Sequence, residues 1–221
     1  MRKLGFCLAV CLCLIATPVT VQATPVQTIE NLQDVLIDSG NITSVDERIE
    51  ALSPTVIQTH DFSAIARLVT GRYWRKFEEV QREQFVSVFT QLSVMTYAER
   101  FKSLATSKFS YVETLKQPRN SVKIVSTLEL GPDAHFSEFN DKQLFIFEYI
   151  LQQAKQTDDT QANEVWKIIN VVVDGVSDLA LKRSNYVSIL NEQGFEGLIA
   201  ELNNQIANIQ GKSSKKLKPS K

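Results

Sequence analysis

Apolar residues recur every three or four positions through the first half of the chain, which is typical of amphipathic helices. One apolar stripe starts at Val26 and stops at Gly40, and predicts a first helix. A second helix should begin at an S-x-x-E capping box that opens with Ser44 and should continue to about His60, interrupted by Pro54. Two more helices follow, one capped by Asp61 and a longest one over about 79–104.

The period then changes from helical to alternating. Segments 121–130, 143–152 and 166–173 alternate as strands do, and 107–115 is a weaker candidate. Strands so close together connect as antiparallel hairpins. Helical spacing returns at 179–191, which Gly194 closes, and in a terminal amphipathic helix that should end at Gly211. The order predicts an α+β fold: N-terminal helices, an antiparallel sheet of about four to five strands, and C-terminal helices.

The strand at 143–152 is apolar on both faces. One face carries Phe145, Phe147 and Tyr149, and the other is apolar except for Glu148. A sheet with one wet face should alternate more cleanly, so we expect both faces to be covered. Ordinary packing explains this pattern, and an internal cavity for an apolar ligand explains it as well; periodicity favours ordinary packing without deciding.

The N-terminus has the form of an export signal. Arg2 and Lys3 precede a 13-residue apolar run, and a V-x-A sequence ends at Ala23. The sequence therefore predicts a signal peptide over 1–23, one domain over 24–211 and a Lys-rich disordered tail over 212–221. A lipoprotein signal that uses Cys11 or Cys13 is the alternative, which the bulky residues before each cysteine disfavour.

The composition of the chain after residue 23 excludes several classes of functional site and of partner. The cysteines all precede it, which excludes a disulfide framework, a thiolate-zinc site and a cysteine nucleophile. The body over 24–211 holds 17 basic and 25 acidic residues, a balance that argues against nucleic acid as a partner.

Catalytic and cofactor motifs are nearly absent. The glycines form no nucleotide-binding loop, and His60 and His135 are expected at the surface of separate loops. No metal, cofactor or enzymatic activity is therefore expected. Glu148 is the exception, because burial would raise its pKa and make it a candidate general base, although a position at a rim or edge is commoner.

Two blocks of residues resemble a known family. They are Gly71–Arg75, Gln81–Phe85 and Thr96–Phe101, followed by Trp166–Ile168, Val173–Ser177, Arg183, Tyr186 and Gly194–Ile199. In this order they resemble the MlaC/toluene-tolerance family of periplasmic lipid-binding proteins over about 29–206, and the start of the longest helix is also similar to the hopanoid-associated HpnM branch. The chain departs from the family pattern at Asp178, where an apolar residue is usual, and at Lys182, where an aromatic is usual.

The resemblance implies a nuclear-transport-factor-like cone, with a curved sheet and helices around an internal apolar pocket. It implies a soluble periplasmic carrier whose cargo is phospholipid, which shuttles between an outer-membrane lipoprotein-porin complex and an inner-membrane ABC transporter and so maintains outer-membrane lipid asymmetry. The alternatives are a carrier of hopanoid or another lipid, a small cone-fold enzyme that uses Glu148 as a base, and a structural adaptor of the envelope. The expected lipid-binding wall comprises Phe89, Leu92, Tyr97, Phe101, Phe145, Phe147, Tyr149, Trp166, Ile169, Val171 and Val173.

Overall fold

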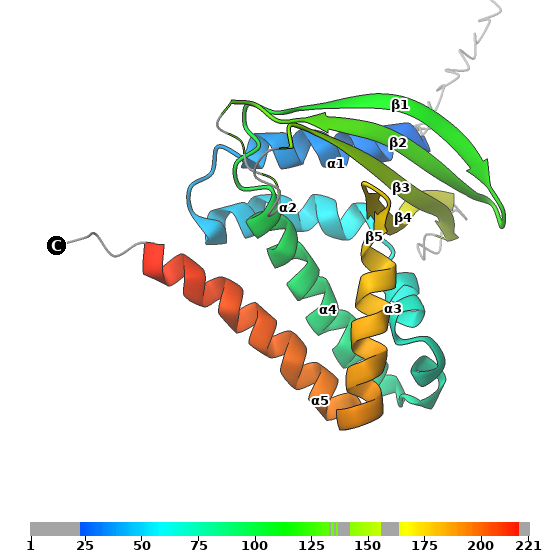
Figure 1. Ribbon diagram of the computed structural model, residues 1–221. Coiled ribbons are helices and arrows are strands. Elements are labelled where there is room, and N and C mark those ends of the chain that lie inside the picture. Colours follow the sequence, from blue (N-terminus) through cyan, green and yellow to red (C-terminus); the bar gives the residue numbers. More distant parts are fainter. Residues whose placement is uncertain (1–22, 133, 135, 137–141, 156–163, 217–221) are drawn as a thin grey trace, which may run out of the picture.

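The computed structural model describes residues 23–132, 134, 136, 142–155 and 164–216, so most of the expected signal peptide and His135 lie outside the described residues. The elements are α1 (Pro25–Ser39), α2 (Val45–Thr59), α3 (Phe62–Thr70), the 3-10 helix η1 (Gly71–Lys76), α4 (Glu79–Arg100), β1 (Lys108–Gln117), β2 (Ser121–Glu129), β3 (Leu144–Lys155), β4 (Glu164–Val173), β5 (Val176–Ser177) and α5 (Asp178–Lys216). This confirms the predicted α+β fold (Figure 1).

The strands form one antiparallel sheet in sequence order, β1 to β5. The sheet curves without closing and arches over α1 and α2 (Figure 1). The weak candidate at 107–115 is therefore a strand. β5 was not predicted: Asp174 and Gly175 both have positive φ, 50° and 80°, and form the tight turn that folds β5 back on β4.

Helix starts follow the expected local chemistry. Thr24 caps α1 and exchanges hydrogen bonds with Gln27, while Pro25 occupies the first turn. The Asp61 side chain accepts a hydrogen bond from the Ala64 backbone N–H at 2.8 Å, as an N-cap should. Pro54 lies inside α2 without ending it.

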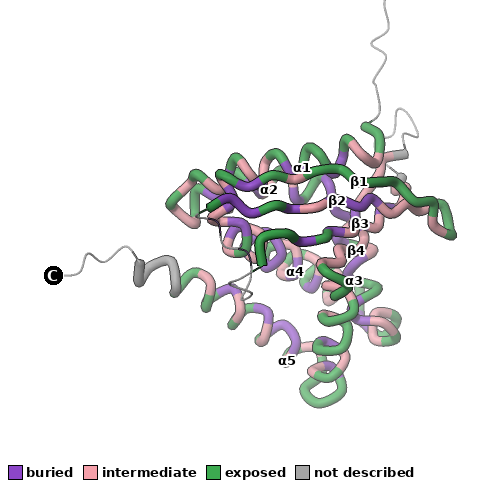
Figure 2. The backbone as a smooth tube through the Cα atoms, turned by 45° about the horizontal axis from the view of Figure 1, so that its top comes forward, coloured by how far each residue is buried: buried purple, intermediate pink, exposed green. Residues whose placement is uncertain are grey.

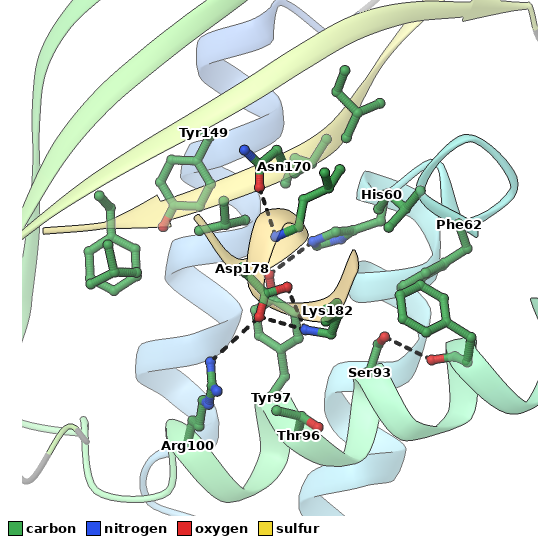
Figure 3. A pocket seen from close by; sticks show the side chains of 18 of the residues that line it. His60, Phe62, Ser93, Thr96, Tyr97, Arg100, Tyr149, Asn170, Asp178 and Lys182 are labelled. Atoms are coloured by element: carbon green, nitrogen blue, oxygen red, sulfur yellow. Dashed lines mark hydrogen bonds and ion pairs between the residues drawn. The ribbon is translucent and has the colours of Figure 1, made fainter. Parts of the chain in front are cut away.

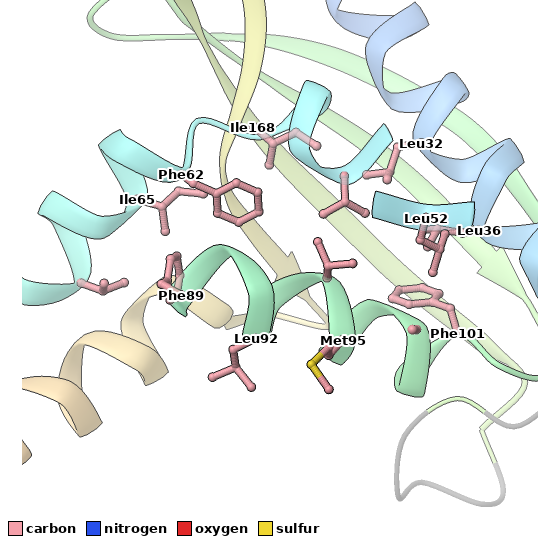
Figure 4. Packing of buried hydrophobic residues seen from close by; sticks show 14 of the residues in the cluster. Leu32, Leu36, Leu52, Phe62, Ile65, Phe89, Leu92, Met95, Phe101 and Ile168 are labelled. Carbon is pink, nitrogen blue, oxygen red and sulfur yellow. The ribbon is translucent and has the colours of Figure 1, made fainter. Parts of the chain in front are cut away.

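The concave side of the sheet is filled by α1 and α2. Leu32 and Leu36 from α1, and Leu52 and Val56 from α2, are fully buried. Gln33 on α1 reaches the sheet and ties the two layers together by hydrogen bonds to Ser126 and Tyr149. One end of the sheet's inner face is thus solid core (Figure 4).

The helices α3, α4 and α5 form a second group below the sheet (Figure 1). α5 bends at Gly194, where φ of 70° places the backbone in the left-handed region that glycine tolerates, and the helix packs against α4 and α3. The two arms match the two C-terminal helices predicted. The predicted end at Gly211 is wrong, because the helix continues to Lys216, and the predicted end of α4 at residue 104 is wrong by about one turn.

The expectation that both faces of 143–152 are covered is also wrong. Phe145, Phe147 and Tyr149 are buried on the inner face. On the outer face Leu144 and Ile146 remain 51% and 48% exposed. The sheet is therefore packed on one side only, and β1 at its edge is exposed along most of its length (Figure 2).

Candidate functional site

A cavity opens between the inner face of β3 and β4, the helices α3 and α4, and the start of α5 (Figure 3). Its wall is mainly apolar and aromatic, as in most ligand-binding pockets. The residues that line it are His60, Phe62, Ile65, Phe89, Ser93, Thr96, Tyr97, Arg100, Phe101, Phe136, Phe147, Tyr149, Ile168, Ile169, Asn170, Val171, Val173, Asp178, Leu179 and Lys182.

The cavity is enclosed at one end and open at the other. The whole hollow, including the part continuous with solvent, has a volume of about 780 Å³. The centres of water-sized spheres have about 80 Å³ available to them. The enclosed space is therefore much smaller than the whole hollow.

Stacked aromatic rings form much of the wall. Tyr97 stacks on Phe101 with ring centroids 5.5 Å apart, and Phe147 stacks on Tyr149 at 5.9 Å. Phe101 and Phe147 then meet at 6.4 Å, which joins α4 to β3. Such pairs add to the burial energy of the rings, so this part of the wall is stabilised by contacts between α4 and β3.

One buried histidine lines the cavity. His60 Nδ1 lies 2.9 Å from the Val56 carbonyl oxygen, which can only accept, so Nδ1 carries the hydrogen. Nε2, 2.9 Å from the Tyr97 hydroxyl, therefore accepts a hydrogen bond from it. Burial lowers the pKa of His60 to about 4, and the imidazole is neutral near pH 7.

The other polar side chains within the cavity are also satisfied by protein partners. The Ser93 hydroxyl donates to the Phe89 carbonyl at 2.8 Å, and the Thr96 hydroxyl to the Leu92 carbonyl at 2.7 Å. The Asn170 side-chain oxygen accepts from the Leu179 backbone N–H at 3.2 Å. The interior therefore offers a bound molecule mostly hydrocarbon contact.

Charge is concentrated at the open end. Arg100 comes from the last turn of α4, and Asp178 and Lys182 from the first turns of α5 (Figure 3). Lys182 forms an ion pair with Asp178, and Arg100 lies 4.0 Å from the same carboxylate. The side chain of Arg100 is 57% exposed, so this group borders on water.

Most of the predicted wall residues meet at this cavity. Those that line it are Phe89, Tyr97, Phe101, Phe147, Tyr149, Ile169, Val171 and Val173. Leu92, Phe145 and Trp166 do not: Leu92 points to the other side of α4 (Figure 4), Phe145 packs on Phe136, and Trp166 lies further along β4. Whether any of the predicted residues contacts lipid stays a prediction.

The prediction that His60 is a surface residue is wrong, because its exposed fraction is 7%. The sequence holds a signal for this position, since Leu52, Val56 and His60 follow one another at four-residue spacing on the buried face of α2. Phe136 also lines the cavity although it belongs to no helix or strand, and no periodicity could have identified it.

Glu148 lies outside this cavity. It projects from the outer face of β3, where it forms an ion pair of 2.7 Å with Lys123 on the neighbouring strand. It is therefore not placed to act as a base on a molecule bound beneath the sheet.

A second hollow lies between α1 and β1 and differs in character. It is wider, with about 620 Å³ for the centres of water-sized spheres, but it is open and more polar than apolar. The α1 carboxylates of Glu30, Asp34 and Asp38 line it. Burying hydrocarbon chains beside these charges would be unfavourable, so the smaller cavity is the better candidate site.

Across the described ranges, no cluster of His, Cys, Asp and Glu has the arrangement needed to hold a metal ion. Among the helices described, none combines the length and apolar character that crossing a bilayer requires.

Comparisons with known proteins agree with this architecture. The family model described as MlaC protein matches residues 26–204. The chain is 29% identical over 135 residues to the "Intermembrane phospholipid transport system binding protein MlaC" of Haemophilus influenzae, and the match covers 61% of this chain and only 56% of that relative. The fold matches a phospholipid-binding protein from Ralstonia solanacearum, solved in complex with a phospholipid, with a TM-score of 0.67 at 16% identity over 85% of this chain and 99% of that one.

Proposed function

The chain belongs to the MlaC family, and from this membership together with the cavity beneath β3 we propose that it is a phospholipid carrier. The acyl chains lie against the aromatic wall, and the headgroup stays at the open end. The observation that carries the proposal is the convergence of apolar residues from α3, α4, β3 and β4 on one hollow whose interior polar groups are already satisfied.

The free energy of exposing acyl chains to water explains why a lipid needs a carrier. Each buried methylene is worth about 0.8 kcal/mol, so a lipid with two long chains does not leave a membrane for water unaided. A carrier needs a hydrocarbon-lined cavity and no reactive cluster inside it. The described part of this cavity meets both conditions.

The size of the enclosed end adds a constraint. The centres of water-sized spheres have only about 80 Å³ of the hollow of about 780 Å³ available to them, so most of the hollow is not enclosed. We therefore propose that the chains also occupy the open part of the hollow, and that its walls separate further during loading. The sheet is not closed, so its free edges do not oppose such widening.

The wider role follows the family. We propose that the carrier works in the periplasm, receives lipid from one membrane complex and delivers it to another, with an outer-membrane lipoprotein-porin complex and an inner-membrane ABC transporter as partners. The chain shows no nucleotide-binding motif, so the direction of transfer would be set by such partners. It acts without catalysis in this proposal, since Glu148 lies on the opposite face of the sheet.

Lipid extraction from protein purified from the periplasm without detergent tests the proposal. Mass spectrometry should find about one phospholipid per protein; a hopanoid instead would favour the HpnM-type alternative. Val171→Trp should fill the cavity and remove the lipid, and Val173→Phe should do so with a smaller change. Val172→Trp is the matched control, because Val172 pairs with Glu148 on the outer face.

Wild-type protein that carries no lipid would contradict the proposal. So would equal lipid content in folded Val171→Trp and Val172→Trp proteins. Circular dichroism establishes that each variant is folded before its lipid is counted.

A further inference from the structure

The charged side chains that line the cavity are gathered at its mouth. Among the described residues that line the cavity three are charged: Arg100, Lys182 and Asp178. Two cations therefore share one carboxylate. The mouth carries a net positive charge, although the sequence over 24–211 is acidic.

The side chains of Arg100 and Lys182 both lie next to the carboxylate of Asp178. Asp178 accepts hydrogen bonds from Lys182 through both of its carboxylate oxygens, and Arg100 lies 4.0 Å away on its other side (Figure 3). Asp178 is the first residue of α5, where the helix dipole also favours a negative group. An anion bound in this position would thus face two side-chain cations and a helix N-terminus.

The side chains of these ion pairs are partly exposed to solvent. The side chains of Asp178 and Lys182 are 39% and 23% exposed, and Arg100 is more exposed still. Pairs with this exposure contribute little to stability, so a competing anion can replace the carboxylate at small cost. Asp178 can then turn towards water.

The location matches the polar end of a lipid. Arg100 precedes Phe101, whose ring forms part of the aromatic wall, and Asp178 lies close behind Val173 at the end of β4. A molecule with its chains against Phe101 and Val173 would bring the group that joins those chains to the mouth. In a phospholipid that group is a phosphate diester.

We propose that Arg100 and Lys182 bind the phosphate of the cargo lipid, and that Asp178 neutralises them when the carrier is unloaded. This rests on the proposed function and adds a headgroup site to it. Arginine and lysine both recognise phosphate through charge-assisted hydrogen bonds. The site selects lipids that bear a phosphate over uncharged lipids with the same chains.

Vesicle uptake by delipidated mature protein tests the site. Two probes have the same acyl chains: phosphatidylglycerol, which bears a phosphate, and diacylglycerol, which does not. Lys182→Gln and Arg100→Gln should each weaken phosphatidylglycerol uptake about tenfold, the size expected for one charge-assisted hydrogen bond, and should affect diacylglycerol uptake much less. Asp178→Asn should strengthen phosphatidylglycerol uptake several-fold, because it removes the competing carboxylate.

Lys102→Gln is the matched control. Lys102 lies two residues beyond Arg100 and pairs with Glu99, but it does not line the cavity. It should leave the uptake of both lipids unchanged.

The outcomes separate the two proposals. Unchanged phosphatidylglycerol uptake in Lys182→Gln and Arg100→Gln, or weaker uptake in Asp178→Asn, would overturn the headgroup site and leave the carrier intact. Failure of the wild type to take up either lipid would overturn the carrier itself. Inorganic phosphate that blocks phosphatidylglycerol uptake at equal concentration would show a site for free phosphate, which also overturns the proposal.

Discussion

The two faces of β3 are built from similar residues and have different surroundings. On the inner face Phe147 and Tyr149 are about 1% exposed and line the cavity, whereas on the outer face Ile146 is 48% exposed. The outer face instead holds the Lys123–Glu148 ion pair. The difference shows that apolar content alone does not make a binding surface, because the helices must lie over it as well.

The largest expected effect concerns packing on the two faces. Phe147→Ala should lower the free energy of unfolding by about 4 kcal/mol, because it removes a ring that packs on Phe101 and Tyr149. Ile146→Ala should change it by less than about 1 kcal/mol, since that side chain is half exposed. Urea denaturation of lipid-free protein measures both, and equal losses would remove the distinction between the faces.

A somewhat smaller effect depends on pH. Below about pH 6.5 the unfolded chain protonates His60, whereas the folded protein, with a pKa of about 4, does not. The unfolded state then binds more protons, so this contribution to stability is complete above pH 6.5 and is lost as the pH falls towards 4. The loss should amount to about 3 kcal/mol.

His60→Gln isolates this contribution from the carboxylates that also titrate in acid. The free energy of unfolding of the variant should fall less steeply than that of the wild type between pH 6.5 and 4. Parallel curves would mean that the His60 ring is not buried neutral beneath the sheet.

The smallest effect is expected on the outer face. Glu148→Gln removes one partner of a pair whose side chains are 22% and 30% exposed, and should cost less than about 1 kcal/mol. Lipid content should not change. A loss of bound lipid, or of a measurable turnover, would revive the interpretation of Glu148 as a functional residue beneath the sheet.

The sequence predicts the elements well because their signals are local. The capping residue Asp61, the alternation in 121–130 and the bend at Gly194 each depend on neighbours within a few positions. The family model confirms the family resemblance. Most of the residues expected for the lipid-binding wall line the cavity, but they are fewer than half of the residues that do.

Two features could not be predicted from local pattern. Whether the outer face of β3 is covered depends on where the helices pack, and alternation says nothing about that. The mouth of the cavity joins Arg100 to Asp178 from distant parts of the chain, through an arrangement that only the fold creates. Asp178 and Lys182 depart from the family pattern in the sequence, but only the fold brings them together at the mouth of the cavity.

Photo-crosslinking tests the central claim most directly. A phospholipid with a photoreactive diazirine in one acyl chain is loaded into the protein and activated, and the adducts are located by peptide mass spectrometry. The account predicts adducts on residues that line the cavity, above all Phe101, Phe147 and Tyr149. Adducts confined to Leu144 and Ile146 on the outer face would contradict it.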